Sequence, residues 1–440
     1  MRILISTGLN SGEAEYRNIG DVAMLQAAVD RVSEFWPEAE ILVLTDSPTD
    51  LVRFCPNARP LSRNGAKTWV GDHVLLGQLH RLLPDSASNL LSAAKQRFRT
   101  RRPGILRAML RARFLVRDSE DRSRAVESFL SALETSDLLL ICGSGGFADS
   151  CREWNLFTLA LIETAMVAGV PVALTGQGIG PISDCDVIAR MRRVLPHVAL
   201  FASRGTRGAD ALARELGIPG DVFCTTGDDA VEPAYKARPA LPGCAIGVNL
   251  RVATYSGVSE DVADVTGAVL RSFAESRGTT LVPLPIATHA YANDANTLGR
   301  ILGMATSSFG TLDSDSPQYT YGQTARCRLV VTGAYHAAVF ALSQGIPAIC
   351  ISGSDYYAFK FAGLRSLFGA GCTIIDLQQE DLEKSLSISL QEAWKQADYI
   401  RQELLDAART QINASRNVFL RLQKLFPAHS GPGVKLVSIP

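Results

Sequence analysis

The chain has 440 residues, of which 47% are hydrophobic and 20% are charged. This length predicts two domains of roughly 200 residues each, because a single hydrophobic core rarely serves a chain this long. Lysine plus arginine equals aspartate plus glutamate, at 44 each, so no net charge favours nucleic acid as a partner.

Nine cysteines and six histidines are scattered along the chain, with neither a C-x-x-C pair nor an H-E-x-x-H motif. This pattern predicts reduced thiols and no metal site. No apolar run approaches the ~20 residues of a membrane helix, and the first residues read as a strand rather than a signal segment. We expect a soluble, cytoplasmic protein.

The first predicted elements are a strand over residues 2–6, a helix over residues 22–35 and a strand over residues 40–44. Asp21 precedes the helix and is a natural N-cap, since its carboxylate can accept from the exposed N–H groups of the first turn. The same residue could instead serve a functional site. Both interpretations stay open at this point.

Residues 60–128 interrupt the alternation of strands and helices and predict a helical insertion. Its segment 95–117 contains no acidic residue and nine basic ones: Lys95, Arg97, Arg99, Arg101, Arg102, Arg107, Arg111, Arg113 and Arg117. Apolar residues recur there at roughly helical spacing, namely Leu106, Met109, Leu110, Phe114 and Leu115. Such a helix can lie on an anionic membrane or bind an anionic acceptor. It can equally be a solvated face over an ordinary packed stripe.

Three further strands of the first half end in segments of chemical interest. Residues 137–142 lead into a glycine cluster over 143–147, and residues 172–175 lead into a second cluster over 176–181. Residues 200–202 lead to Arg204, which could also pair with a neighbouring acid, Asp210 or Glu215. Glycines let the backbone approach a ligand, and parallel strands open their carboxyl ends on one cleft.

The second half begins after two prolines within residues 237–242, which interrupt regular structure. A strand over residues 245–249 is followed by Arg251, and a strand over residues 280–284 is followed by His289. An apolar run over residues 329–331 then leads into a helix with His336 in its first turn. A helix N-terminus attracts anions and a histidine carries a proton near neutral pH, although His336 could simply cap its own loop.

The chain thus divides into residues 1–238, with the basic insertion at about 60–128, and residues 239–395. Residues 396–440 are expected to form a helix that crosses back to the first domain, followed by a tail.

Several motifs resemble the polysaccharide pyruvyl transferase family. The C-terminal signature consists of Tyr335-His336-Ala337, Gln344-Gly345-Ile346-Pro347, Tyr356-Tyr357 and Lys360-Phe361. Asn18-Ile19-Gly20-Asp21, both glycine clusters and Arg204 resemble the family's other motifs, and His289 does so loosely. The resemblance implies an α/β fold with two Rossmann-like parallel-sheet domains that face a central cleft, similar to GT-B glycosyltransferases. It also implies transfer of pyruvate from phosphoenolpyruvate to a sugar hydroxyl as a ketal.

If phosphoenolpyruvate is the donor, His336 would act as the acid or base or would bond the phosphate directly, and Asp21 could orient or deprotonate the acceptor hydroxyl. This scheme requires no metal or cofactor. The residues implied or inferred to bind substrate are Arg204, Arg251, Lys360, Asn18, Gly20, Gly145, Gly146, Gln177, Gly178, Tyr335 and His289. The family commonly has an arginine where this chain has Ala334, and we expect Arg251 to take its place. The implied partners are phosphoenolpyruvate and a sugar or lipid-linked saccharide, with a possible peripheral contact to an anionic membrane at its inner face.

Two alternatives remain. A GT-B glycosyltransferase would use a nucleotide sugar, but retaining enzymes of that kind usually carry a glutamate after the histidine region, and residues 337–345 contain no acid. A carbohydrate-binding homologue without catalytic activity would fit Ala334, while His336 and Arg204 argue against it.

Overall fold

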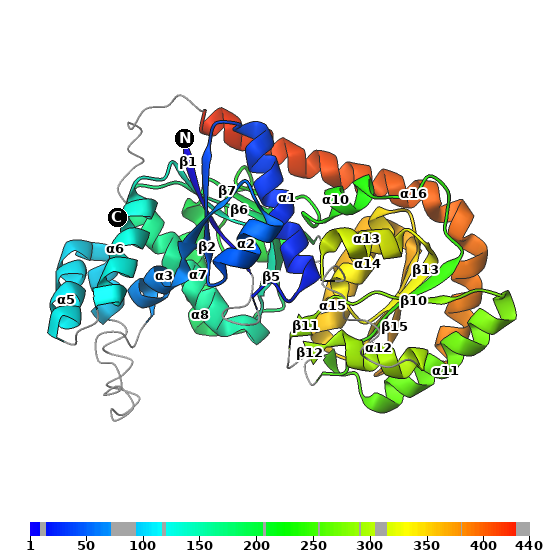
Figure 1. Cartoon of the computed structure of the whole chain (residues 1–440). Helices are drawn as coiled ribbons and strands as arrows, with labels where there is room; N and C mark the ends of the chain where they lie inside the picture. The colour runs from blue at the N-terminus through cyan, green and yellow to red at the C-terminus, as the bar shows by residue number, and fades with distance from the viewer. Residues whose placement is uncertain are drawn as a thin grey trace.

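The computed structural model describes residues 1–8, 15–71, 94–116, 120–205, 208–253, 256–289, 292–303, 315–379 and 381–427. The described chain is built around two parallel sheets that lie side by side and are spanned by one long helix (Figure 1). The predicted α/β class with two parallel-sheet domains is therefore confirmed.

The first sheet has the strand order β3-β2-β1-β4-β6-β7-β8, and β5 pairs with β6. Its strands are β1 (Arg2–Ser6), β2 (Glu40–Thr45), β3 (Arg59–Ser62), β4 (Leu138–Ile141), β5 (Ser144–Phe147), β6 (Val172–Ile179), β7 (Leu200–Ser203) and β8 (Phe223–Thr225). The central strands are buried apolar runs, as expected where helices cover both faces of a parallel sheet. The first glycine cluster contributes β5, a short strand that pairs in parallel with β6.

The helices of the first domain are α1 (Ile19–Phe35), α2 (Pro48–Phe54), α3 (Arg63–Val70), α5 (Pro103–Val116), α6 (Glu120–Glu134), α7 (Arg152–Val167), α8 (Cys185–Val194), α9 (Ala209–Glu215) and α10 (Val231–Lys236). Helix α1 begins three residues earlier than predicted, because the side chain of Asn18 caps it and accepts from the N–H of Gly20 at 3.1 Å. The prediction that Asp21 is the N-cap is therefore wrong, and Asp21 lies in the first turn.

The basic segment forms helical residues 94–101 and α5, at the edge of the first domain farthest from the second sheet (Figure 1). Lys95 and Arg99 are buried. Arg107 and Arg111 both pair with Glu127 of α6. Arg117 lies outside the described residues.

The prediction of a packed apolar face on this segment is only partly correct. Leu106, Leu110 and Phe114 are buried in the core of the first domain. Met109 is 42% exposed, whereas Leu106, Leu110 and Phe114 share their cluster with Val126, Phe129 and Leu130 of α6. The side chain of Leu115 lies outside the described residues.

The second sheet has the order β10-β9-β13-β14-β15, all parallel. Its strands are β9 (Ala245–Asn249), β10 (Leu281–Pro283), β13 (Cys327–Thr332), β14 (Ala348–Ser352) and β15 (Cys372–Asp376), and a short ribbon pairs β11 (Thr288–His289) with β12 (Ala292–Asn293). Its helices are α11 (Glu260–Arg277), α12 (Asp294–Leu302), α13 (Pro317–Thr324), α14 (Tyr335–Ser343) and α15 (Asp355–Phe368). The change from one sheet to the other falls between Thr225 and Ala245, around the boundary expected at residues 237–242.

Helix α16 (Leu382–Leu425) runs along both domains (Figure 1). Its 44 residues span about 65 Å at the usual helical rise. Leu386 is buried in the core of the second domain, Leu404 in a core shared by both domains and Phe419 in a core of the first domain. One helix, which starts earlier than residue 396, therefore holds the two sheets together.

Candidate active site

The two domains meet at the carboxyl ends of their strands. The N–H of Ile19 donates to the carbonyl of Ile286 at 2.8 Å, and the N–H of Thr288 donates to the carbonyl of Arg17 at 2.9 Å. Ile19 also belongs to a buried apolar cluster that includes Ala337 of α14. The N-terminal motif at residues 18–21 therefore lies against the second domain.

Gly20 of α1 lies directly beside the imidazole of His336. A Cβ built on Gly20 would stand 1.8 Å from Nδ1 of His336 and 2.0 Å from Cγ. No side chain larger than hydrogen fits there, so the glycine is required by the close approach of the two motifs. His336 is only 7% exposed.

On its other side, His336 faces a carboxylate of the first domain. Nε2 of His336 lies 3.6 Å from Oδ2 of Asp228, which follows β8. The same Oδ2 accepts from Nη1 of Arg204 at 2.9 Å. Arg204 therefore pairs with Asp228 and not with the acids of its own helix region. Its guanidinium also stacks on the ring of Tyr335, 4.4 Å from the ring centre.

The protonation of Asp228 follows from these contacts. Burial alone would raise the pKa of this carboxyl, but His336, Arg204 and the N–H of Ala230 outweigh burial and hold the pKa at about 2. Asp228 is therefore ionised at neutral pH, and its single charge lies between a guanidinium and an imidazole.

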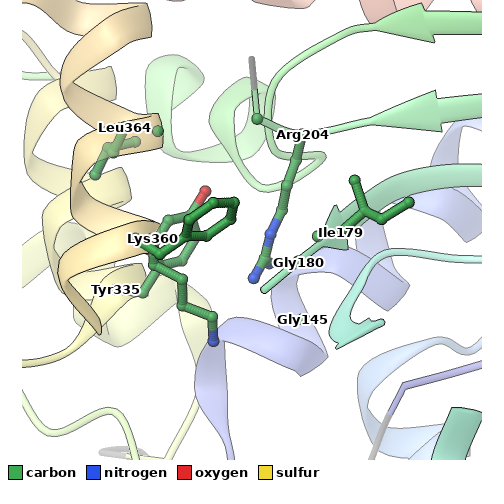
Figure 2. A pocket seen from close by; sticks show the side chains of 11 residues that line it. Gly145, Ile179, Gly180, Arg204, Tyr335, Lys360 and Leu364 are labelled. Atoms are coloured by element: carbon green, nitrogen blue, oxygen red, sulfur yellow. The ribbon is translucent and has the colours of Figure 1, made fainter. Parts of the chain in front are cut away.

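A second cation, Lys360 of α15, lies near the guanidinium of Arg204 and lines the same pocket (Figure 2). A Cβ built on Gly145 would lie 2.8 Å from Nη2 of Arg204 and 3.0 Å from Nζ of Lys360, so both groups converge on this glycine. Nζ lies 3.9 Å from the ring centre of Tyr356, a cation–π contact. No carboxylate pairs with Lys360 in the part of the chain that the structure describes.

Lys360 loses its proton more readily than an exposed lysine does. Burial and the neighbouring charge of Arg204 lower the pKa of Lys360 to about 7. Asp21 lies in the same field: burial raises the pKa of Asp21, while His336, Arg204 and Lys360 oppose that rise. Two cations, one histidine and two carboxylates thus gather where the domains meet.

A cavity of about 30 Å³ opens beside the two cations. Five of the residues predicted from sequence line it: Gly145, Gly178, Arg204, Tyr335 and Lys360. Ile179, Gly180, Gly205, Phe359, Gly363 and Leu364 complete the lining. Asn18, Gly20, Asp21 and His336 lie outside the lining, and the last two belong to the same charged cluster.

Gln177 and Gly146 pack against other residues of the first domain. The side chain of Gln177 is fully buried, and its Nε2 donates to the carbonyls of Ile141, Cys142 and Thr175 at 2.8–3.1 Å. A Cβ on Gly146 would stand 2.3 Å from the ring of Trp154. Both residues therefore shape the strand ends and do not line the cavity.

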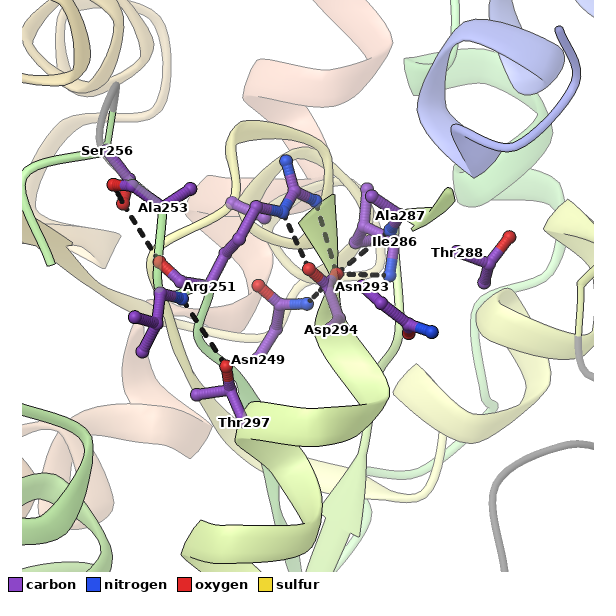
Figure 3. A network of polar contacts seen from close by, with 12 residues as sticks. Asn249, Arg251, Ala253, Ser256, Ile286, Ala287, Thr288, Asn293, Asp294 and Thr297 are labelled. Atoms are coloured by element: carbon purple, nitrogen blue, oxygen red, sulfur yellow. Dashed lines mark hydrogen bonds and ion pairs between the residues drawn. The ribbon is translucent and has the colours of Figure 1, made fainter. Parts of the chain in front are cut away.

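Arg251 is engaged in a network of its own (Figure 3). Its Nε donates to Oδ1 of Asp294 at 2.6 Å, and both residues are buried. Asp294 also accepts from Asn249 and from the N–H groups of Ile286 and Ala287 at 2.7–2.9 Å. The network fixes the segment that binds the N-terminal motif and pairs Arg251 with Asp294. Arg251 is also among the charges that lower the pKa of Lys360.

Ala334 and His289 are the two remaining positions that the sequence singled out. Ala334 caps α14 and is 3% exposed, and its N–H donates to Oγ1 of Thr332 at 2.8 Å. His289 contributes its backbone to β11, and its side chain lies outside the described residues.

Sequence reasoning missed Asp228 as a site residue and named Tyr356 only within a motif. The available signal for Asp228 was its position in Gly227-Asp228-Asp229, directly after a strand. The hydroxyl of Tyr356 donates to the backbone carbonyl of Gly145 at 3.3 Å. No group of three or more His, Cys, Asp or Glu side chains suited to a metal ion occurs among the described residues.

A family model for polysaccharide pyruvyl transferases matches residues 18–355. The chain belongs to the polysaccharide pyruvyl transferase family. The match includes Gly20, Arg204, Asp228 and His336 and ends before Lys360. A comparison with curated proteins finds no match. No helix in the described ranges is long and apolar enough to cross a membrane.

Solved structures similar to this member of the family share its fold at low identity. A Listeria monocytogenes protein assigned as a UDP-N-acetylglucosamine 2-epimerase is 12% identical with a TM-score of 0.56, covering 99% of both chains. The UDP-GlcNAc 2-epimerase of Neisseria meningitidis, bound to UDP-GlcNAc, is 12% identical with a TM-score of 0.55, covering 96% of this chain and all of its own. The glycosyltransferase of kitacinnamycin is 12% identical with a TM-score of 0.51, covering 97% and 98%. The two-domain fold is thus that of GT-B-like glycosyltransferases and epimerases.

Proposed function

We propose that this protein transfers pyruvate from phosphoenolpyruvate to a sugar, forming a ketal. The observation that carries the proposal is the convergence of Arg204 and Lys360 on one cavity. Arg204 pairs with Asp228, whereas Lys360 has no carboxylate partner among the described residues, so a bound anion would add the missing counter-charge. Phosphoenolpyruvate offers a carboxylate and a phosphate, the groups that guanidinium and ammonium bind best.

The reaction requires two proton movements. Two sugar hydroxyl oxygens bond to C2 of the donor, and the bond from C2 to the phosphate oxygen breaks. One hydroxyl proton is balanced by protonation of the methylene carbon, and the other leaves with phosphate. His336 is assigned the proton for carbon and Asp21 the proton of a hydroxyl, roles that general acids and bases of these types can fill.

The size of the cavity adds a condition. About 30 Å³ accommodates only about one or two water molecules, so the donor requires the two domains to separate at the cleft. Since His336 belongs to the second domain and Gly20 and Asp228 to the first, the same movement uncovers the imidazole. Closure around the donor then excludes water from the reacting groups.

The experiment is product analysis with purified protein. Phosphoenolpyruvate is supplied with a panel of free and lipid-linked saccharides, and phosphate release and the pyruvylated product are measured. Arg204→Ala should weaken donor binding by about 2 kcal/mol or more. His336→Ala should lower turnover by about two to four orders of magnitude. No binding of phosphoenolpyruvate by the unaltered protein would contradict the proposal.

A nucleotide-sugar glycosyltransferase is the second candidate, favoured by similar structures such as the Neisseria epimerase bound to UDP-GlcNAc. Nucleotide sugars therefore belong in the same assay. Turnover of a nucleotide sugar without phosphoenolpyruvate would favour this candidate. Saccharide binding without turnover of either donor would favour a non-catalytic role.

The exposed face of α5 supports a further part of the proposal, contact with an anionic membrane at the cytoplasmic side. Ile105 and Met109 lie one turn apart and are 44% and 42% exposed. Arg101 and Arg102 adjoin them, are exposed, and have no carboxylate partner among the described residues. Apolar side chains beside unpaired basic ones suit a surface of anionic lipid, which would bring the enzyme to a lipid-linked acceptor.

A further inference from the structure

Asp228 occupies an unusual position between the two domains. Its Oδ1 accepts from the N–H of Ala230 at 2.9 Å, which fixes the carboxylate. Its Oδ2 is 2.9 Å from Nη1 of Arg204 and 3.6 Å from Nε2 of His336. One oxygen atom therefore serves a cation of the first domain and faces the imidazole of the second.

Arg204 and His336 interact with this oxygen to different degrees. Arg204 makes a charge-assisted hydrogen bond, whereas Nε2 of His336 has no hydrogen-bond partner in the described structure although it is buried. A buried nitrogen without a partner is costly. The distance of 3.6 Å is short enough to become an ion pair if His336 is protonated and the carboxylate is released by the arginine.

An anion in the cavity would change this balance. Nη2 of Arg204 already faces the cavity beside Lys360, so a bound phosphate or carboxylate competes with Asp228 for the guanidinium. As Arg204 turns to the anion, Oδ2 becomes available to Nε2 of His336.

We propose that Asp228 is a positioning residue that couples donor binding at Arg204 to the proton carried by His336. This inference rests on the proposed function, since it assigns the donor to Arg204 and a proton to His336. Asp228 after β8 and Asp21 of α1 both interact with His336, and Arg204 after β7 and Lys360 of α15 belong to the same charged cluster. Of the two carboxylates, Asp228 is the one that also holds the donor-binding arginine.

The neighbouring aspartate provides a matched control. Asp229 is equally buried but faces away from the cavity: it accepts from Nη1 of Arg31 at 2.8 Å and from the hydroxyl of Ser415 at 3.1 Å. Asp229→Asn removes a charge one residue away and should lower thermal stability. It should leave the pH dependence of turnover where it is in the unaltered protein.

The test compares Asp228→Asn, Asp228→Glu and Asp229→Asn in the full chain. For Asp228→Asn we expect phosphoenolpyruvate to bind at least as tightly, because a competing carboxylate is gone, while turnover falls by about 100-fold or more. The alkaline limb of the pH–turnover profile should move to lower pH, since the imidazolium loses its anionic partner. Asp228→Glu should restore part of this shift. Parallel losses of binding and turnover with an unmoved pH profile would overturn the proposal.

A second measurement does not depend on turnover. Nuclear magnetic resonance of labelled histidine, assigned with His336→Gln, follows the protonation of His336 as inorganic phosphate or phosphoenolpyruvate is added at constant pH. Addition should increase protonation of His336 in the unaltered protein and in Asp229→Asn, but not in Asp228→Asn. An equal response in all three would overturn the coupling, whatever reaction the protein catalyses. Absence of product with the response intact would contradict only the proposed function.

Discussion

Gly20 and His336, which are 316 residues apart in the sequence, are in direct contact, with the glycine Cα against the edge of the imidazole. This contact joins the N-terminal motif of the first domain to the helix start of the second. Because the ring is enclosed by Gly20 on one side and Asp228 on the other, the proton-carrying candidate lies at the contact between the two domains.

Replacing Gly20 should therefore disturb the site more than the fold. Gly20→Ala places a methyl group within 2.0 Å of the His336 ring, and relieving such overpacking typically costs about 1–3 kcal/mol. We expect turnover to fall by at least about tenfold, with a lower melting temperature. Gly322→Ala is the control, because a Cβ there meets no atom within 4 Å. If both substitutions had equally small effects on turnover and melting temperature, the His336 ring would have moved to make room for the added methyl group.

The affinity for the donor should depend on pH through Lys360. The pKa of Lys360 is lowered to about 7, and an anion beside the amine favours its charged form, so binding takes up a proton. Affinity should fall as pH rises through 7, by about tenfold between pH 6 and pH 8. Calorimetry with phosphoenolpyruvate measures this change.

Lys360→Arg provides the comparison for that measurement. Its guanidinium stays charged across this range, and the donor's own ionisation affects both proteins equally. The extra pH dependence should therefore disappear in the variant. Identical pH dependence in the two proteins would remove Lys360 as the titrating group.

Much of the fold was predictable because its signals are local. The buried strands β1, β4 and β13 are short apolar runs, and the restart of the pattern after the prolines marks the second sheet. The strand ends could be placed on one cleft because all the strands of the two main sheets are parallel.

The rest depended on contacts between distant segments. Asp228 is significant only because β8 lies beside β7, which sets it next to Arg204, and because the second domain brings His336 to it. Met109 is exposed while Leu106 and Leu110 of the same helix join a core that includes residues of α6. Arg251 finds Asp294, 43 residues away. No periodicity or motif spacing encodes such pairings.

The pairing of Arg251 with Asp294 gives a prediction about stability. Removal of one partner of a buried ion pair typically costs about 3–5 kcal/mol, and we expect a loss of this order for Arg251→Ala in urea denaturation. Donor affinity of the folded protein should fall less than in Arg204→Ala, because Asp294 already neutralises Arg251. The double variant Arg251→Met with Asp294→Asn should regain part of the stability. A larger loss of donor affinity than in Arg204→Ala would instead place Arg251 at the donor.

Ala334→Arg tests whether the family's common arginine can simply be restored. Ala334 is 3% exposed and belongs to the core shared by the two domains. A guanidinium there must displace packed side chains, so we expect a loss of about 1–3 kcal/mol in stability and lower activity with phosphoenolpyruvate. Increased turnover would show that the site lacks a cation and has room for one.

The last prediction concerns the exposed face of α5. If Ile105, Met109, Arg101 and Arg102 contact lipid, the protein should co-sediment with vesicles that contain anionic phospholipid and should be released as salt rises. Replacing Ile105 and Met109 with serine should weaken sedimentation at every salt concentration, because apolar burial is lost. Replacing Arg101 and Arg102 with glutamine should weaken it mainly at low salt, because screening removes the charge contribution at high salt.

Leu241→Ser is the matched control for these variants, since Leu241 is 79% exposed and belongs to the segment that joins α10 to β9, far along the chain from α5. It should sediment like the unaltered protein. Activity on a soluble acceptor should be the same in all these variants, because none of the substituted residues lines the cavity. Activity on an acceptor embedded in anionic vesicles should fall in step with sedimentation. Unchanged sedimentation after all four substitutions would contradict the membrane contact and leave this segment an ordinary surface role, in which Arg107 and Arg111 pair with Glu127 of α6.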